Sequence, residues 1–145
     1  WVRLSPSMIR VTLDRSYATG EEFDLAIAYS GVSSGGGFGS ITWSTLGGQP
    51  YVYTLSQPYF AYTWWPSKDV SADKATADLR FTVPGNLEVA SNGVLLSDTV
   101  NPDTTRTFHY RTNYQTSPYL FCFGLANYNF FSSSYTHALG TTPLE

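Results

Sequence analysis

The side chains that could bind a catalytic metal are few in this sequence. It holds two histidines, His109 and His137, and one cysteine, Cys122. A zinc hydrolase that binds its metal from one helix needs two histidines four residues apart, a glutamate between them as general base and a further carboxylate ligand. Neither histidine belongs to a His-Glu-x-x-His string. We therefore predict no metal site, no catalytic residue and no cofactor in this chain.

Each of these three side chains has a simpler interpretation. His109 falls on the polar face of an alternating segment, so we expect it in solvent. His137 lies in a polar stretch and has no identifiable partner. Cys122 stands between two phenylalanines in a hydrophobic segment. That setting predicts an inert, buried thiol rather than a nucleophile.

Two of the four charged residues between Gln57 and Ala75 suggest acid–base chemistry. The segment reads QPYFAYTWWPSKDVSADKA and contains Asp69 and Lys74. An acid–base pair is one interpretation. In the other, Asp69 accepts backbone N–H bonds or pairs with a cation, and so holds its loop in place. We favour the structural role.

The same segment is rich in aromatic side chains, namely Tyr59, Phe60, Tyr62, Trp64 and Trp65. Aromatic faces bind sugar rings, so a carbohydrate-binding surface is one hypothesis. Packing in a core or at a domain interface is the other, because each large ring buries about 150–250 Å². We favour packing.

The spacing of several residues in and around this segment resembles a known pattern. The first element is Thr-x-x-Gln, formed by Thr54 and Gln57. The second starts at a proline and ends in Lys-Ala, and its matching positions are Pro66, Asp69, Lys74 and Ala75. Segment 83–93 reads as strand, turn and strand through Ser-Asn-Gly, and segment 117–125 reads as a closing strand. Together they resemble the non-catalytic N-terminal domain of the aminopeptidase N family of zinc metallopeptidases, the gluzincins. Ser67 stands where that family commonly has cysteine, and Val70-Ser71 replaces Glu-Pro.

The resemblance gives Gln57 a role. In the family the matching residue helps to hold the free α-amine of a peptide substrate, and an amide oxygen can accept a hydrogen bond from an ammonium group. The alternative is a glutamine that ends a strand before a turn at Pro58. The resemblance also implies a cis bond after Gln57, a geometry that proline makes less costly. We predict a cis Gln57–Pro58 bond that turns the Gln57 side chain out of the sandwich, against the alternative of an ordinary trans proline.

Composition limits the class of protein. The chain has 145 residues, 42% of them hydrophobic and 17% aromatic, which indicates one globular domain with a packed core. Its net charge of -3 gives no indication of a nucleic-acid or anionic-membrane partner. No apolar run is long enough to span a membrane. Low charge and a single cysteine are typical of exported bacterial β-domains, so we expect a secreted or cell-surface protein.

Alternation of apolar and polar residues predicts the fold. Period-two patterns cover residues 9–13, 23–29, 77–83, 107–111 and 119–125, and residues 89–96 read as a hairpin that turns at Ser91-Asn92-Gly93. Glycine-rich residues 33–40 lack the Gly-Lys-Ser/Thr of a phosphate loop, so we expect a mobile connection there. These patterns predict an all-β, antiparallel sandwich over residues 1–131. Residues 132–145 form a polar tail, which resembles the connection to a catalytic domain.

The leading interpretation is a fragment of a zinc aminopeptidase that contains no catalytic residues. It is shorter than the family's N-terminal domain, which implies missing strands. Its implied partners are the catalytic domain of the parent enzyme, which would carry the zinc, and the N-terminus of the peptide substrate. The alternative is a stand-alone binding or assembly module that pairs through a strand edge or binds carbohydrate. Because edges and apolar surface would be left uncovered, we also expect the chain to self-associate.

Overall fold

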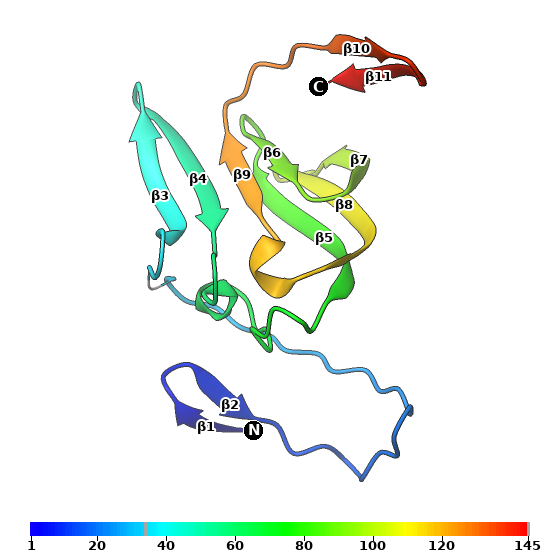
Figure 1. The fold of residues 1–145 in the computed structure, drawn as a ribbon. Helices are drawn as coiled ribbons and strands as arrows, with labels where there is room; N and C mark the ends of the chain where they lie inside the picture. Colours follow the sequence, from blue (N-terminus) through cyan, green and yellow to red (C-terminus); the bar gives the residue numbers. More distant parts are fainter. Residues whose placement is uncertain (34, 145) are drawn as a thin grey trace. The chain divides into compact units, whose positions relative to one another are not determined.

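Regular structure in this chain is almost entirely β (Figure 1). The computed structural model describes residues 1–33 and 35–144, so Ser34 and Glu145 lie outside the described residues. The helical elements among them are two 3-10 turns, η1 (Ala61–Thr63) and η2 (Pro118–Leu120). The strands are β1 (Val2–Ser5), β2 (Met8–Arg10), β3 (Ser40–Leu46), β4 (Gln49–Leu55), β5 (Ala75–Pro84), β6 (Glu88–Ser91), β7 (Val94–Val100), β8 (Thr105–Thr116), β9 (Phe123–Ala126), β10 (Ser133–His137) and β11 (Gly140–Leu144). The predicted all-β class is confirmed.

The strands form antiparallel sheets, consistent with a β-sandwich. One sheet has the order β3-β4-β9-β6 and another has the order β5-β8-β7, while β1-β2 and β10-β11 are two-stranded. The chain divides into two compact units. The first unit comprises residues 1–42, 54–76 and 113–122, and the second comprises residues 43–53, 77–112 and 123–144.

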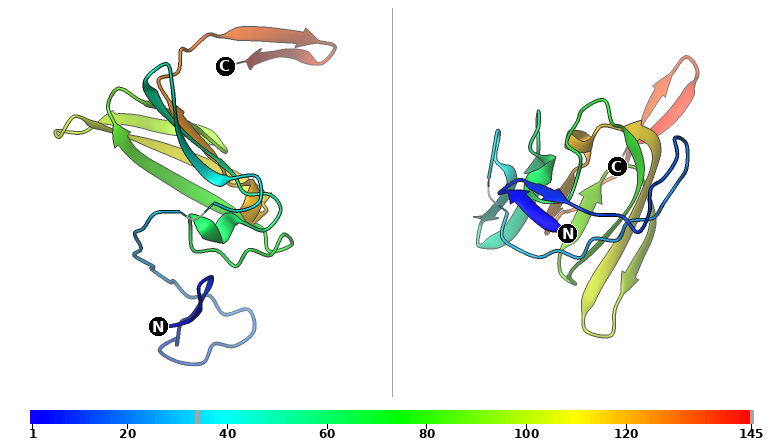
Figure 2. Two further views of the ribbon diagram at one scale, coloured as in Figure 1. Left: turned by 90° about the vertical axis from the view of Figure 1, so that its left-hand side faces the viewer. Right: turned by 90° about the horizontal axis from the view of Figure 1, so that it is seen from below.

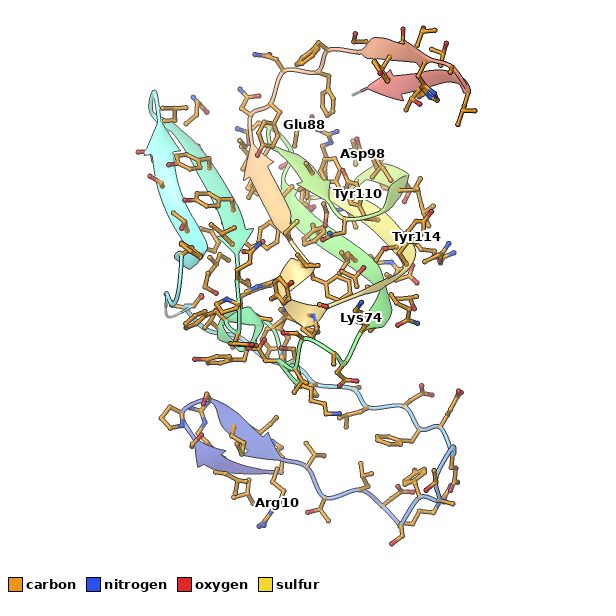
Figure 3. All side chains as sticks on the ribbon, viewed as in Figure 1. Arg10, Lys74, Glu88, Asp98, Tyr110 and Tyr114 are labelled. Carbon is orange, nitrogen blue, oxygen red and sulfur yellow. The ribbon has the colours of Figure 1, made fainter. Side chains whose placement is uncertain are left out.

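The second unit contains a hydrophobic core built from strand residues that alternate as predicted. Phe108 and Tyr110 on β8 are buried, while Arg111 between Tyr110 and Thr112 is exposed. The buried apolar residues of this unit are Val52, Leu87, Val89, Phe108, Tyr110 and Leu125. The Tyr110 hydroxyl donates a hydrogen bond to the Val89 carbonyl at 2.5 Å, so the polar end of this buried ring is satisfied (Figure 3).

The predicted hairpin over residues 89–96 is wrong. β6 pairs with β9, through contacts such as Val89 with Leu125, whereas β7 pairs with β8. Gly93 supplies the predicted turn with a φ of 90°, and a Cβ there would lie 2.8 Å from the Thr112 backbone nitrogen. The turn therefore passes the chain from one sheet to another, because each strand finds its partner elsewhere in the sequence.

The predicted strands near the N-terminus are also largely wrong. Of residues 9–13, only Ile9 and Arg10 lie in a strand, the short β2 that pairs with β1. No helix or strand is assigned among the described residues between Arg10 and Ser40, and Figure 2 draws residues 11–33 as a winding coil. The alternating side chains at positions 23, 25, 27 and 29 are between 38% and 61% exposed. No sheet among the described residues includes this segment.

The predicted polar tail contains a regular hairpin. β10 pairs antiparallel with β11 from Ser133↔Leu144 to His137↔Gly140. The side chains of β10 are exposed. In the described part of the chain, no helix has the length and apolar character needed to cross a membrane.

Candidate functional site

The connection from β4 to β5 carries most of the predicted site residues and lies in the first unit. It begins at Ser56, whose side chain is buried and whose hydroxyl accepts a hydrogen bond from Trp64 Nε1 at 3.0 Å. The Ser56 carbonyl accepts from the Phe60 N–H at 3.0 Å. Residues 57–59 are therefore held between two hydrogen bonds to one buried serine.

The Phe60 carbonyl is a second fixed point of this connection. It accepts hydrogen bonds from the Ser40 hydroxyl at 2.9 Å and from the Thr63 hydroxyl at 2.7 Å. The Thr63 N–H also donates to it, at 3.2 Å, which begins η1. Ser40 is fully buried with a φ of 55°, so the start of β3 is shaped to bring its hydroxyl to this carbonyl.

Residues 113–122 anchor the far side of the connection. The Trp65 ring meets the Phe121 ring edge-on, with centroids 5.6 Å apart. The Ser117 hydroxyl, on a buried residue, donates to the Ser71 carbonyl at 2.7 Å. The loop is thus held by contacts with residues distant in the sequence.

Gln57 follows the last residues of β4 in this loop. The Gln57–Pro58 bond is cis, which confirms that prediction, and Pro58 itself is exposed. We expected the Gln57 side chain to point out of the sandwich, and for its acceptor atom, the amide oxygen, this expectation is wrong. Gln57 Oε1 is buried and has no hydrogen-bond partner among the described residues. The Gln57 amide oxygen is therefore a buried hydrogen-bond acceptor to which no described residue donates.

Asp69 has the features of a structural carboxylate. Its φ is 46°, and burial raises its pKa, while the backbone N–H groups of Ala61 and Tyr62 act in the opposite direction. Its Oδ2 atom is buried without a hydrogen-bond partner among the described residues. Lys74 is exposed immediately before β5 (Figure 3), and an ion pair in this loop joins Lys68 Nζ to Asp73 Oδ2 at 3.1 Å.

The aromatic residues of the loop separate into two groups. Trp64 and Trp65 are partly buried, with their rings tilted by 54° and centroids 6.0 Å apart. Tyr59 and Tyr62 are exposed, and Tyr62 stacks on Phe60 at 6.4 Å. The tryptophans therefore pack on each other and, at Trp65, on Phe121, and the tyrosines are left as surface. Pro66, between these groups and Asp69, is exposed.

Three side-chain expectations are wrong. His109 is 15% exposed and its Nε2 donates to Asp78 Oδ1 at 2.6 Å, because β5 and β8 are neighbours in one sheet. His137 has partners inside its hairpin: the Leu139 N–H donates to Nδ1, and Nε2 contacts the Thr142 hydroxyl, both at 3.2 Å. Cys122 is exposed, and it lies just before β9 rather than inside a strand, next to buried Phe121.

Two charge clusters in the second unit had no signal in the sequence. Arg111 Nε donates to Asp78 Oδ1 at 3.1 Å, and the His109 and Arg111 hydrogen bonds lower the pKa of Asp78. Arg106 is paired with both Asp98 and Glu88, which raise its pKa above the ordinary value. Charges that meet across strands cannot be found by spacing along one strand.

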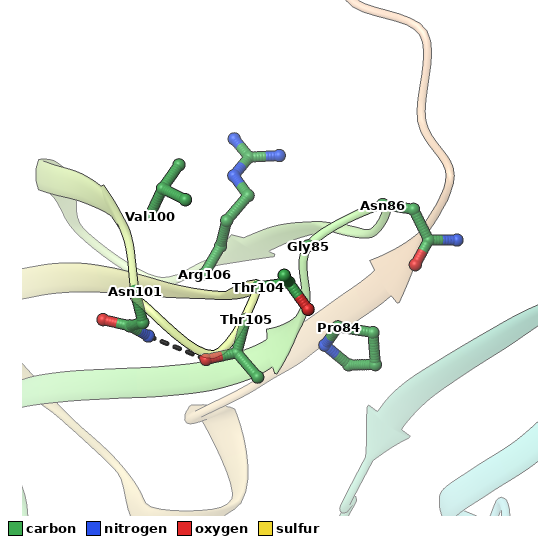
Figure 4. A pocket seen from close by; sticks show the side chains of 8 residues that line it. All are labelled: Pro84, Gly85, Asn86, Val100, Asn101, Thr104, Thr105 and Arg106. Carbon is green, nitrogen blue, oxygen red and sulfur yellow. Dashed lines mark hydrogen bonds between the residues drawn. The ribbon is translucent and has the colours of Figure 1, made fainter.

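A pocket of ≈ 610 Å³ lies in the second unit between two turns (Figure 4). Its residues come from 84–86 and from 100–106. Asn101 Nδ2 donates to Thr105 Oγ1 at 2.9 Å within it, and Arg106 is engaged by its two carboxylates. The Arg106 charge is thus already paired, and we assign this pocket no ligand.

The described residues offer no place for a metal ion. No group of three or more His, Cys, Asp or Glu side chains in residues 1–33 and 35–144 comes together as a ligand set. The residues present do not fit a zinc site, and no chemistry of this chain is assigned to zinc.

Comparison with known proteins agrees with the sequence motif. A sequence profile described as the Peptidase M1 N-terminal domain matches residues 5–120. The chain is similar to a two-domain M1 zinc metallopeptidase mutant bound to L-arginine, with a TM-score of 0.61 and 19% identity over 78% of this chain and 26% of that chain. It is also similar to an M1 zinc metallopeptidase mutant from Deinococcus radiodurans bound to a Tyr-Ser-Ala substrate, with a TM-score of 0.56 and 20% identity over 71% of this chain and 24% of that one.

The chain thus spans about a quarter of the length of these two structures. No curated protein matches it. At such identities the structures show a shared fold, while the profile match covers most of the sequence. The chain belongs to the Peptidase M1 N-terminal domain family.

Proposed function

We propose that this chain acts as the non-catalytic N-terminal domain of a zinc aminopeptidase, where Gln57 helps to hold the free α-amine of the peptide substrate. The domain also supports the catalytic domain, which supplies the zinc and the general base. Family membership and the substrate-bound peptidase with a similar fold support this proposal.

The observation that carries the proposal is the acceptor at Gln57. Its Oε1 atom lacks a hydrogen-bond partner among the described residues, although the backbone around it is tied to Ser56 and Phe60. A buried acceptor without a donor is unfavourable unless a ligand, water or partner supplies one. A substrate ammonium is a suitable donor. Rotation of the half-buried Gln57 side chain would present the oxygen to it.

Two exposed tyrosines on the loop of Gln57 support the second role, contact with the catalytic domain. Tyr59 and Tyr62 are 58% and 41% exposed on the same loop. Tyrosine combines a large apolar ring with a hydroxyl group, and it is enriched in the buried centres of protein interfaces. We assign these two rings to contact with the catalytic domain.

Kinetics of the natural, full-length protein test the role of Gln57. Gln57→Ala should raise KM for an aminoacyl substrate by about tenfold or more, because a hydrogen bond to a charged group contributes about 1.5–3 kcal/mol. Gln57→Glu should lower KM, since a charged acceptor binds an ammonium more strongly. Gln49→Ala, an exposed glutamine on β4, is the matched control. Unchanged KM in Gln57→Ala would contradict the proposal.

The isolated chain should lack enzymatic activity. Residues 1–145 alone should not hydrolyse an aminoacyl chromogenic substrate and should contain no stoichiometric zinc by elemental analysis. Turnover that a chelator abolishes would show that the chain holds a metal site of its own.

The exposed edge of one sheet favours a second candidate, an assembly module. β7 is at the end of the order β5-β8-β7, and all its side chains are exposed, including Val94, Leu95, Leu96 and Val100. An apolar edge strand is a template for pairing with another chain. Light scattering should then show a dimer that Leu96→Lys dissociates, while Val32→Lys, at another exposed apolar residue, leaves it intact. A monomer at high concentration would exclude this candidate.

A further inference from the structure

Two glycines of the glycine-rich stretch lie directly against the Phe60 ring, within the first unit. A Cβ on Gly36 would be 2.7 Å from Phe60 Cε1 and closer still to Cδ1. A Cβ on Gly37 would be 2.6 Å from both Cδ2 and Cε2. Real Cβ atoms do not approach other carbons this closely, so the ring occupies the space that any side chain at either position would need.

Gly37 also lies close to the backbone of Gln57. A Cβ on Gly37 would lie 2.7 Å from the Gln57 carbonyl oxygen. Gly37 therefore lies directly against the Gln57 carbonyl, and both glycines lie against the ring of Phe60, whose backbone closes the turn that contains Gln57. Close approach of one backbone to another is a use for which glycine is the suitable residue.

The backbone of Phe60 is held in place beside these glycines. Its N–H is bonded to the Ser56 carbonyl, and its own carbonyl accepts from Ser40 and Thr63. With both backbone groups engaged, a side chain added at position 36 must displace either the ring or the glycine-rich backbone. A ring that does not rotate clear of the new methyl group transmits the displacement to the short 56–60 turn that contains Gln57.

We propose that Gly36 and Gly37 are positioning residues for Gln57, acting through the Phe60 ring and the Gln57 carbonyl. The proposal rests on the proposed function where it concerns amine binding. It assigns to the glycine-rich stretch a role that its composition does not suggest, since the sequence alone predicts a mobile connection there. The two glycines are required for space rather than for flexibility.

Gly36 offers the cleaner test because its φ is not in the left-handed region, whereas Gly37 has a φ of 54°. Gly36→Ala therefore adds a steric conflict with Phe60 and little backbone strain. Gly35→Ala is the matched control, because a Cβ there would meet only the Gly39 carbonyl oxygen, at an ordinary 3.5 Å. Combining Gly36→Ala with Phe60→Ala removes the atoms with which the new methyl group collides.

The experiment measures KM and kcat of the natural, full-length protein, together with the NMR shifts of the Gln57 side-chain amide. We expect Gly36→Ala to raise KM between about threefold and tenfold with kcat little changed, since misplacing Gln57 weakens a charge-linked hydrogen bond without abolishing it. The Gln57 amide should shift as well. Gly35→Ala should change neither KM nor the amide shift. The rise in KM of the double variant, Gly36→Ala with Phe60→Ala, should be smaller than the product of the rises in the two single variants.

The outcomes separate this proposal from the proposed function. If Gln57→Ala leaves KM unchanged, the proposed function fails, and the amide shift alone then decides on positioning. If Gln57→Ala raises KM but Gly36→Ala moves neither KM nor the amide, the positioning role is overturned. Should Gly36→Ala not fold, Phe60→Leu replaces it: loss of the flat ring should shift the Gln57 amide, and an unmoved amide would overturn the proposal.

Discussion

Residues 11–33 and residues 77–112 contain similar alternating patterns but differ in how they are held. In the first region the side-chain contacts are local: Tyr17 bonds Asp14, Arg15 pairs with Glu21, and Glu21 accepts from the Ala18 N–H. In the second they join residues far apart in sequence, such as Tyr110 with Val89 and His109 with Asp78.

This difference explains why one pattern becomes a strand and the other does not. Leu79, Phe81 and Val83 on β5 are partly buried beside β8, whereas Phe23, Leu25, Ile27 and Tyr29 are exposed. Burial of apolar area contributes about 25 cal/mol per Å², and a strand gains it only with neighbours. Alternation therefore marks a segment able to form a strand, and long-range partners decide whether it does.

The largest expected contrast is between two phenylalanines. Phe108→Ala should lower the free energy of unfolding by about 3–5 kcal/mol, because its side chain is 2% exposed and its loss leaves a cavity. Phe23→Ala, at a residue 48% exposed, should change it by less than about 1 kcal/mol. Urea unfolding followed by fluorescence measures both. Equal effects would show that residues 11–33 are packed in solution.

Two glycines with similar φ angles sharpen the comparison. Gly20 and Gly93 have φ values of 85° and 90°, so alanine at either position carries a backbone cost of about 1–2 kcal/mol. Gly93→Ala should lower the free energy of unfolding by about 1–3 kcal/mol more than Gly20→Ala does. The reason is that its methyl group would collide with the Arg111 and Thr112 backbone, whereas nothing lies within 4 Å at Gly20. Thermal unfolding of the two variants provides the measurement, and matching losses would contradict the close approach at Gly93.

A smaller effect is expected at a single hydroxyl. Tyr110→Phe should lower the free energy of unfolding by about 0.5–1.5 kcal/mol, because the buried hydrogen bond to the Val89 carbonyl is lost. Tyr29→Phe, at a residue 61% exposed, serves as the control and should have no measurable effect. Chemical denaturation of both variants decides whether the Tyr110 hydroxyl contributes to stability.

The smallest effect concerns acid stability. The pKa values of Asp78 and Glu21 are both lowered, by His109 and Arg111 in one case and by Arg15 in the other. A carboxyl group whose pKa is lower in the folded state stabilises the fold above its unfolded pKa, near 4, and loses that contribution as the pH falls.

Only the partners of Asp78 require folding to meet it, since those of Glu21 are close in sequence. The denaturant concentration at the unfolding midpoint should fall as the pH drops below about 4, and Asp78→Asn should make this fall smaller, whereas Glu21→Gln should not. Denaturation at a series of pH values compares them. A decline unaltered by Asp78→Asn would show that the cross-strand cluster contributes nothing to acid stability.

The sequence by itself determined the all-β class, the family and the cis bond at Gln57–Pro58. Alternation, turn glycines and motif spacing are properties of neighbouring residues, so they can be recognised without a structure. They also located the loop that carries Gln57 and Asp69. The glycine turn at Gly93 was recognised correctly, although its connection was not.

Only the tertiary structure decided which segments meet. It paired β6 with β9 rather than β7, brought Asp78 to His109, and laid Gly36 and Gly37 on the Phe60 ring. It also left residues 23–29 outside any sheet. Each of these results depends on contacts between residues distant in sequence, and local patterns do not encode which partner supplies the most favourable burial and hydrogen bonding.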